Sequence, residues 1–345
     1  MKFFITLLWA AILALGMSGT LGAAEGSANG YLLILSKADR EMKVLDYVTL
    51  APVASIPVGE DPHEIALSDD RHTAYVSNPV MNGPGHYIHV VDLQKLTLVN
   101  VVDTAPLYIP HGLAFVQGKL WFTAQGAKAV AVYDPQENKM TDVFGTGQDF
   151  THLLHVTPDG NRFYTTNVES GTVSIFTKKG LPPYMPPTGV LPPNAKPRHE
   201  WRQTLVDVGA GAEGFDITPD GSTLWTARPD GHIVIVDLTA EKVIGDIDTG
   251  VSGLHRLKFT PDGKSAAVVS VKTGDLLFYG VQSRQLENSA AICQGAGIYM
   301  DAKSSRMFVS CTPNDTVAVV DLKTRHVVKH IPIGRPDSIM ATVQP

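Results

Sequence analysis

The sequence has almost no cysteine: Cys293 and Cys311 are the only two in 345 residues. No Cys-x-x-Cys-His segment occurs, so no covalently attached haem is encoded. Runs of Lys or Arg are also missing, and the formal net charge is −6. Because duplex binding requires a basic surface that neutralises phosphates, no nucleic-acid partner is expected. The sequence also lacks the motifs Gly-x-Ser-x-Gly and His-Glu-x-x-His and a phosphate loop. No short catalytic motif therefore indicates an enzyme class.

Long hydrophobic runs are missing except at the N-terminus. Lys2 precedes an apolar run over residues 3–17, and the small residues Gly22, Ala23 and Ala24 follow it. This run is too short to span a bilayer comfortably, and the pattern is typical of a cleaved signal peptide at residues 1–24. The mature chain, residues 25–345, is therefore expected to be periplasmic or secreted, without a membrane span.

The two cysteines are interpreted in the light of that compartment. In an oxidising environment a cysteine pair is more often bridged than free, so a Cys293–Cys311 disulfide is expected. The alternative is a soft-metal role beside nearby histidines.

One strand pattern recurs through the rest of the chain. Its clearest copies are YIHVVDL (87–93), AVAVYDP (129–135), HIVIVDL (232–238) and TVAVVDL (316–322). Equivalent positions, counting two weaker copies, are separated by 42, 43, 60, 43 and 41 residues. Each period contains apolar, β-branched runs separated by turns, three of which are Pro-Asp-Gly (158–160, 219–221, 261–263). The pattern predicts an all-β fold, a seven-bladed β-propeller of four-stranded blades.

The two ends of the repeat array complement each other. The first unit begins with YLLILS (31–36), which matches a second strand, while residues 335–345 repeat an opening strand with nothing after it. We therefore expect the C-terminal strand to complete the first blade and close the ring. The long interval contains a proline-rich insertion at 178–201, placed between the third and fourth strands of blade four. A tolerated surface insertion is expected, and a docking loop recognised by an aromatic-lined groove is the alternative.

The segments YVSN (75–78) and YTTN (164–167) carry a family resemblance. Each follows a Pro-Asp-Gly-like turn and precedes a strand of the recurring pattern, so the chain resembles the YVTN-repeat propellers of secreted and surface-layer bacterial proteins. It is more distantly similar to the propellers of dissimilatory nitrite reductase, its haem-maturation proteins and quinoprotein dehydrogenases. The resemblance implies the fold over the whole mature chain, whereas function differs among these proteins.

Histidines gather at one position of the repeat. The residues that open the seven first strands are His63, His111, His152, Glu213, His255, Ala296 and Asp337. In a propeller these positions form an arc around one mouth of the central channel. Three interpretations are open: a zinc, copper or iron site on His63, His111, His152 and His255, a polar mouth that binds a small ligand or peptide, or purely structural histidines. Arg228 is predicted on the same rim, as a candidate for binding an anionic group.

Three functions follow from these features. The first is an exported, monomeric binding module whose rim holds a small molecule or a periplasmic protein, with Glu213, Asp337 and Arg228 among its ligand-binding residues. The second is a metal- or cofactor-dependent enzyme, a lactonase-like hydrolase or a redox protein, in which Glu213 acts as ligand or general base. The third is a carrier or maturation factor for a modified haem, with one histidine as axial ligand.

Overall fold

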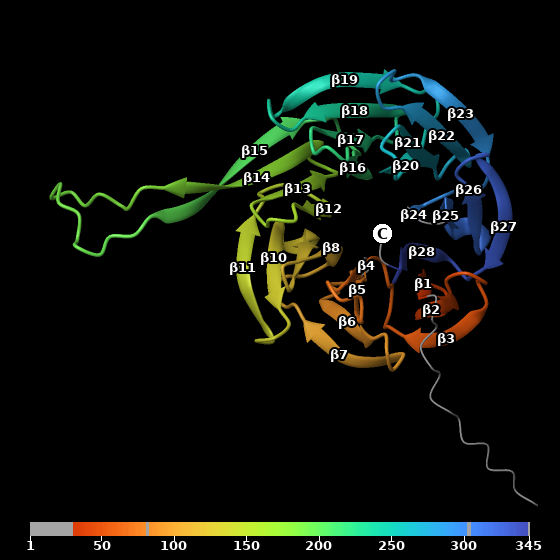
Figure 1. Cartoon of the computed structure of the whole chain (residues 1–345), viewed down its shortest axis with the longest axis horizontal. Helices are drawn as coiled ribbons and strands as arrows, with labels where there is room; N and C mark the ends of the chain where they lie inside the picture. Colours follow the sequence, from red (N-terminus) through yellow and green to blue (C-terminus); the bar gives the residue numbers. More distant parts are fainter. Residues whose placement is uncertain (1–29, 81–82, 302–304, 344–345) are drawn as a thin grey trace, which may run out of the picture.

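The computed structural model describes residues 30–80, 83–301 and 305–343. They form seven four-stranded antiparallel sheets arranged as blades around a central axis (Figure 1). The predicted all-β, seven-bladed propeller is confirmed. The predicted signal peptide, residues 1–24, lies outside the described residues. In the part of the chain that is described, no helix is long and apolar enough to cross a membrane.

The strand bounds follow the repeat, from the inner strand of each blade outward. Blades one to four are β28 (Pro336–Ala341), β1 (Tyr31–Ser36), β2 (Glu41–Asp46), β3 (Pro52–Pro57); β4 (Ile65–Leu67), β5 (Thr73–Asn78), β6 (Tyr87–Asp92), β7 (Thr97–Asp103); β8 (Pro110–Val116), β9 (Lys119–Ala124), β10 (Ala129–Asp134), β11 (Lys139–Gly145); β12 (Thr151–Val156), β13 (Arg162–Asn167), β14 (Thr172–Leu181), β15 (Arg198–Asp207). Blades five to seven are β16 (Phe215–Ile217), β17 (Thr223–Ala227), β18 (His232–Asp237), β19 (Lys242–Asp248); β20 (Leu254–Phe259), β21 (Ser265–Ser270), β22 (Asp275–Gly280), β23 (Leu286–Ala291); β24 (Gly297–Asp301), β25 (Arg306–Cys311), β26 (Thr316–Asp321), β27 (His326–Pro332).

The ring closes as the sequence predicted. Strand β28 pairs antiparallel with β1, with Ile339 opposite Ile34. The closure is strengthened from blade two, where the Arg71 guanidinium donates to the carbonyl oxygens of Ala341 and Val343 at 3.1 and 2.5 Å. Apolar side chains on both faces of the second and third strands pack between neighbouring blades. This continuous packing holds the inner strands in fixed positions around the channel.

Strands β14 and β15 are longer than the other strands and continue beyond the ring as a hairpin arm (Figure 1). The arm carries residues 178–201, the predicted insertion, whose two ends are paired with each other in β14 and β15. Its root is anchored by Trp201, whose ring lies 5.1 Å from that of Phe144 and 5.2 Å from that of Phe163. The arm therefore leaves the body from a packed aromatic cluster.

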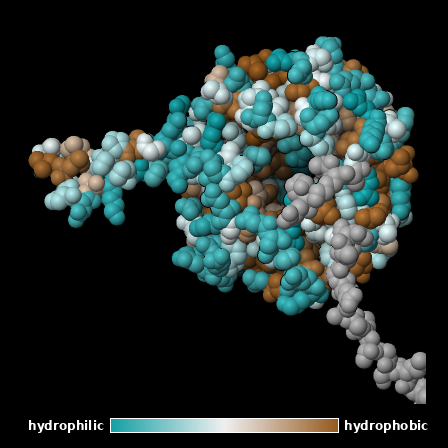
Figure 2. Space-filling view, viewed as in Figure 1, coloured by the Kyte–Doolittle hydropathy of each residue, from teal (hydrophilic) through white to brown (hydrophobic). Residues whose placement is uncertain are grey.

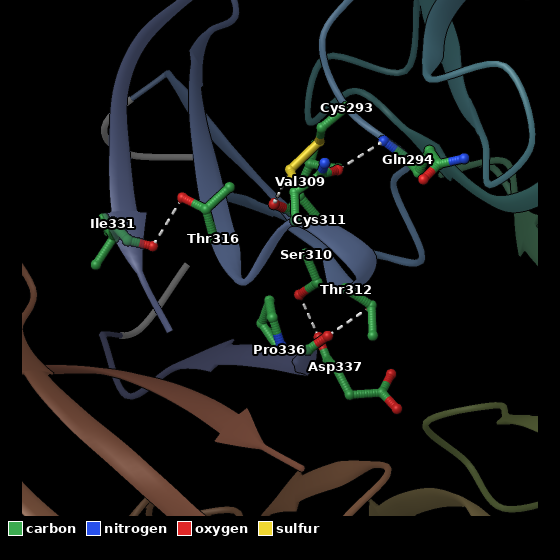
Figure 3. The surroundings of a disulfide bond; sticks show 11 residues. Cys293, Gln294, Val309, Ser310, Cys311, Thr312, Thr316, Ile331, Pro336 and Asp337 are labelled. Carbon is green, nitrogen blue, oxygen red and sulfur yellow. Dashed lines mark hydrogen bonds between the residues drawn. A yellow bond between two sulfur atoms is a disulfide. The ribbon is translucent and has the colours of Figure 1, made fainter. Parts of the chain in front are cut away.

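Cys293 and Cys311 form a disulfide, with their Cα atoms 5.6 Å apart (Figure 3). Cys293 lies two residues beyond the end of β23, and Cys311 is the last residue of β25. The bond thus joins blade six to blade seven. The disulfide prediction is confirmed, and neither sulfur is a free thiolate that could bind a soft metal.

Candidate functional site

The first strands bulge where they carry the histidine arc. In blades three, four and six the pairing register shifts between Pro110 and Leu113, Thr151 and Leu154, and Leu254 and Leu257. His111, His152 and His255 each lie inside such a shift. A bulge redirects a side chain that regular alternation would place elsewhere. In blade two, β4 begins at Ile65, and before it the His63 N–H donates to the carbonyl oxygen of Ser77 at 3.0 Å.

Three of the arc histidines form a row of packed rings. The ring centroids of His63 and His111 are 4.6 Å apart, and those of His111 and His152 are 3.8 Å apart. His111 and His152 are 1% and 5% exposed. Burial, followed by the neighbouring His152 and His63, holds the pKa of His111 well below its ordinary value. His111 is therefore a neutral imidazole at pH 7.

Glu213 joins this row to His255. Its Oε1 accepts from Nε2 of His152 at 2.9 Å and from Nε2 of His255 at 3.0 Å. Burial alone would raise the pKa of Glu213, but the charge of His255 and the hydrogen bonds from both rings outweigh it and hold that pKa well below the usual range. The central carboxylate is thus ionised in a half-buried position.

The outer partners of the two histidines set their protonation. Gln125 donates from its amide to Nδ1 of His152, so that ring carries its proton on Nε2. Nδ1 of His255 lies 3.0 Å from the carbonyl oxygen of Ala296, and a ring that faces a carbonyl and a carboxylate must donate from both nitrogens. Burial would lower the pKa of His255, yet Glu213 outweighs burial and raises it. Around Glu213 the site therefore contains one imidazolium and one neutral imidazole.

A second charged group closes the arc beside His63. Lys37 donates to Nε2 of His63 at 2.9 Å and pairs with Asp337 at 2.5 Å. On the next position along the first strands, Arg256 pairs with Glu64, also at 2.5 Å. The sequence predicted His63 and Asp337 but missed Lys37, Glu64 and Arg256. Glu64 and Arg256 directly follow His63 and His255. Their shared position in the repeat, next to the arc, could have identified them as site residues.

Arg228 lies outside this network. Its guanidinium bonds the Asp230 carboxylate and donates to the carbonyl oxygen of Val208 at 3.3 Å. These contacts hold it within its own turn. The structure thus brings together His63, His111, His152, Glu213, His255 and Asp337, but it does not bring Arg228 to them.

The four histidines do not fit a metal ion in this arrangement. Both ring nitrogens of His152 and of His255 are engaged by other groups, and the ammonium of Lys37 faces Nε2 of His63. The rings of His63 and His111, and those of His111 and His152, pack against each other at interplanar angles of 60° and 35°. Among the described residues, no group of three or more His, Cys, Asp or Glu side chains is placed to hold a metal.

A cavity of about 520 Å³ runs along the channel and reaches the network from inside, through Glu64, Arg256 and Asp337. Figure 2 shows a hollow at the centre of the ring. Apolar side chains of the first strands form much of the cavity wall: Leu113, Leu154, Phe215, Leu257, Ile298 and Ile339. His155, Asp216 and Lys258 add polar groups, with Lys258 3.5 Å from Asp216. The arrangement offers a chamber whose wall combines apolar and charged side chains, with the charged network at its inner end.

Comparison with known proteins supports the fold. No family model matches the sequence, and no curated protein matches it by sequence. Among solved structures, a candidate 6-phosphogluconolactonase from Bacteroides uniformis superposes with a TM-score of 0.72 at 13% identity, covering 91% of this chain and 99% of that one. Hydrazine synthase of Kuenenia stuttgartiensis has a TM-score of 0.64 at 16% identity, with coverage of 81% and 92%.

A third neighbour is the dihydro-heme d1 dehydrogenase NirN in complex with DHE, with a TM-score of 0.62 at 14% identity, covering 92% of this chain and 76% of that one. At these identities the likeness establishes the propeller fold and nothing finer.

Proposed function

We propose that this chain is an exported binding protein of the YVTN-repeat type that holds a small organic molecule in its central channel. The observation that carries the proposal is the cavity of about 520 Å³, which ends at a buried, charged network. Small-molecule sites are typically concave, about 300–1,000 Å³ in volume, and lined by apolar side chains with a few fixed polar groups. The channel matches the volume and the concave shape, and its lining combines apolar side chains with charged ones.

The chemistry of the lining favours an amphipathic molecule with an anionic group. The apolar part would contact side chains such as Leu113, Leu154 and Leu257. The anionic part would meet cationic side chains on the wall, of which Lys258 is 46% exposed and Arg256 is buried against Glu64. Lys258 makes only a long contact with Asp216, so it can turn toward a ligand at little cost.

In this proposal the histidine network supports the ligand site from behind. His111, His152 and Asp337 are buried, and the network's charged groups are largely paired with one another. Buried and paired groups keep the inner end of the channel rigid and charge-balanced, which is the role of a supporting shell around a binding site. The ligand then reaches the network from the cavity.

The enzyme and haem-carrier alternatives receive less support. Two structural neighbours are described by names of those kinds, a candidate lactonase and NirN in complex with DHE. In this chain, however, the ring nitrogens of His152 and His255 and the Glu213 oxygen nearest them are engaged with each other or with neighbouring groups. A binding role uses the observed geometry without rearranging it.

Titration with 1-anilinonaphthalene-8-sulfonate, an apolar probe with one anionic group, tests the proposal. We expect one probe molecule to bind per chain, with enhanced and blue-shifted emission. Leu154→Trp should weaken binding at least about tenfold because the indole fills the channel. The matched control is Leu205→Trp on the exposed outer strand of blade four, which should bind as the parent chain does. Equal binding by the two variants, or no binding by the parent chain, would refute the proposal.

A further inference from the structure

The hairpin arm ends in apolar side chains that the fold does not cover. Val190 and Tyr184 are 72% and 68% exposed, and Met185 and Leu191 beside them are exposed as well. Figure 2 shows hydrophobic residues at the end of the arm, with a hydrophilic stem between them and the body. Exposed apolar clusters of this kind mark interaction sites in soluble proteins.

The stem carries a positive charge although the whole chain is acidic. Between residues 178 and 202 there are five cationic side chains, Lys178, Lys179, Lys196, Arg198 and Arg202, and one carboxylate, Glu200. Arg198 pairs with Glu200 at 3.2 Å, and Arg202 lies 3.6 Å from Glu241. The three lysines form no ion pair within the described residues. Against a net charge of −6 for the chain, this local excess is a separate electrostatic feature.

The cations and the tip have a fixed geometric relation. Lys179 is paired in register with Glu200, and Leu181 with Arg198, at the last rungs of the hairpin before the tip begins. Positive side chains therefore border the apolar tip on both strands. Where an apolar segment enters the boundary of a lipid bilayer, flanking lysines and arginines lie at the level of the headgroups.

The tip is held in shape by two turns. The Gly189 N–H donates to the carbonyl oxygen of Pro186 at 2.9 Å, and the Ala195 N–H donates to that of Pro192 at 3.0 Å. Proline at the second position of each turn presets the backbone. A preorganised tip loses less conformational entropy when it binds.

We propose that the arm docks on a membrane surface rich in anionic lipid, with the tip residues Tyr184, Met185, Val190 and Leu191 entering the interface and the stem cations contacting the headgroups. Charge complementarity selects this occupant. A groove that recognises proline-rich chains would use the tip alone and would leave the stem lysines without a role. This docking is independent of ligand binding in the channel.

The test places an environment-sensitive dye on the tip. Because both native cysteines are bonded to each other, Val190→Cys in the full-length protein supplies the one thiol for a nitrobenzoxadiazole label. Vesicles of phosphatidylcholine containing about 30% phosphatidylglycerol should raise and blue-shift its emission, whereas vesicles of phosphatidylcholine alone should not. The same label at Val328→Cys, an exposed site on β27, is the control and should not respond.

Two sets of substitutions distinguish the tip from the stem. In the labelled protein, Tyr184→Ser with Leu191→Ser should weaken vesicle binding, and so should Lys178→Gln with Lys179→Gln and Lys196→Gln. Because each lysine near an anionic surface is worth about 1 kcal/mol, the triple change should cost on the order of a hundredfold in affinity. A tip dye unchanged by anionic vesicles would overturn the proposal, and so would vesicle binding that neither set weakens. A dye response only to solubilised envelope proteins would assign the tip to a protein partner and also overturn it.

Discussion

At the scale of single residues, Glu213 is the half-buried carboxylate at the centre of the network. Its Oε1 accepts from His152 and His255, which come from the neighbouring blades on either side. Removing one partner of a buried ion pair leaves the other charge without compensation. Glu213→Gln should therefore destabilise the protein by about 3–5 kcal/mol in urea denaturation. Glu60→Gln, which removes an exposed carboxylate paired with Arg40, should change the free energy of unfolding by less than about 1 kcal/mol. Similar losses in both variants would contradict a central role for Glu213.

His111 should make the free energy of unfolding depend on pH. Its pKa is lowered well below 6.5 by burial, so the unfolded chain takes up a proton near pH 6.5 while the folded chain does not. The free energy of unfolding should then fall as pH drops below about 6.5, with up to about 1.4 kcal/mol per pH unit from this residue. His255 acts in the opposite direction, because its raised pKa adds stability that is complete below pH 6.5 and is lost as pH rises through its folded pKa.

Unfolding curves of the parent chain and two variants, recorded between pH 7 and 5, separate the contribution of His111 to acid stability from that of other groups. His111→Phe keeps a ring between His63 and His152 but cannot titrate, so its stability should fall less steeply with acid than that of the parent chain. His72→Phe removes an exposed histidine and should keep the parent slope. An unchanged slope in His111→Phe would show that its burial does not control acid stability.

The sequence repeat locates some residues of the network and not others. His63, His111, His152 and Glu213 could be aligned because they occupy one repeat position, and the structure brings them together. Gln125 and Lys37 reach the network from loops, where no strand pattern fixes the direction of a side chain. Arg228 was expected at the site but is bonded to Asp230 two residues away, a local contact that sequence spacing does not reveal.

At the scale of elements, the Cys293–Cys311 disulfide is the one side-chain cross-link between blades among the described residues. The two cysteines are 18 residues apart in the sequence. A disulfide that closes a loop of this length should stabilise the fold by about 3 kcal/mol, mainly by reducing the conformational entropy of the unfolded chain. Cys293→Ala with Cys311→Ala should lower the urea midpoint accordingly. Reductant should lower the midpoint of the parent chain toward that of the double variant and leave the variant unchanged. A parent midpoint that does not respond to full reduction would contradict this estimate.

Strands were more predictable than their exact starts. The second and third strands of each blade pair with each other without a register shift. The first strands of blades three, four and six bulge at the arc, which an apolar pattern does not reveal. The arm at 178–201 was located correctly from the broken period, but its continuation as a paired hairpin depends on a register between β14 and β15 that the prolines do not reveal.

At the scale of the whole molecule, the ring depends on its last strand. Strand β28 pairs with β1, supplies Asp337 to Lys37, and receives Arg71 at its end. A chain ending at Arg335 should leave the edge of β1 unpaired and lose cooperative unfolding, as monitored by circular dichroism and light scattering. A chain ending at Val343 keeps β28 and should unfold like the parent. Equal behaviour of the two truncations would show that closure by β28 is dispensable.

If the channel, and not an outer surface, holds the ligand, a crystal of the protein soaked with 1-anilinonaphthalene-8-sulfonate should show the probe there. We expect it between Leu113, Leu154 and Leu257, with its sulfonate toward Lys258 or Arg256. An empty channel, with the probe on the outer strands or the arm tip, would contradict it.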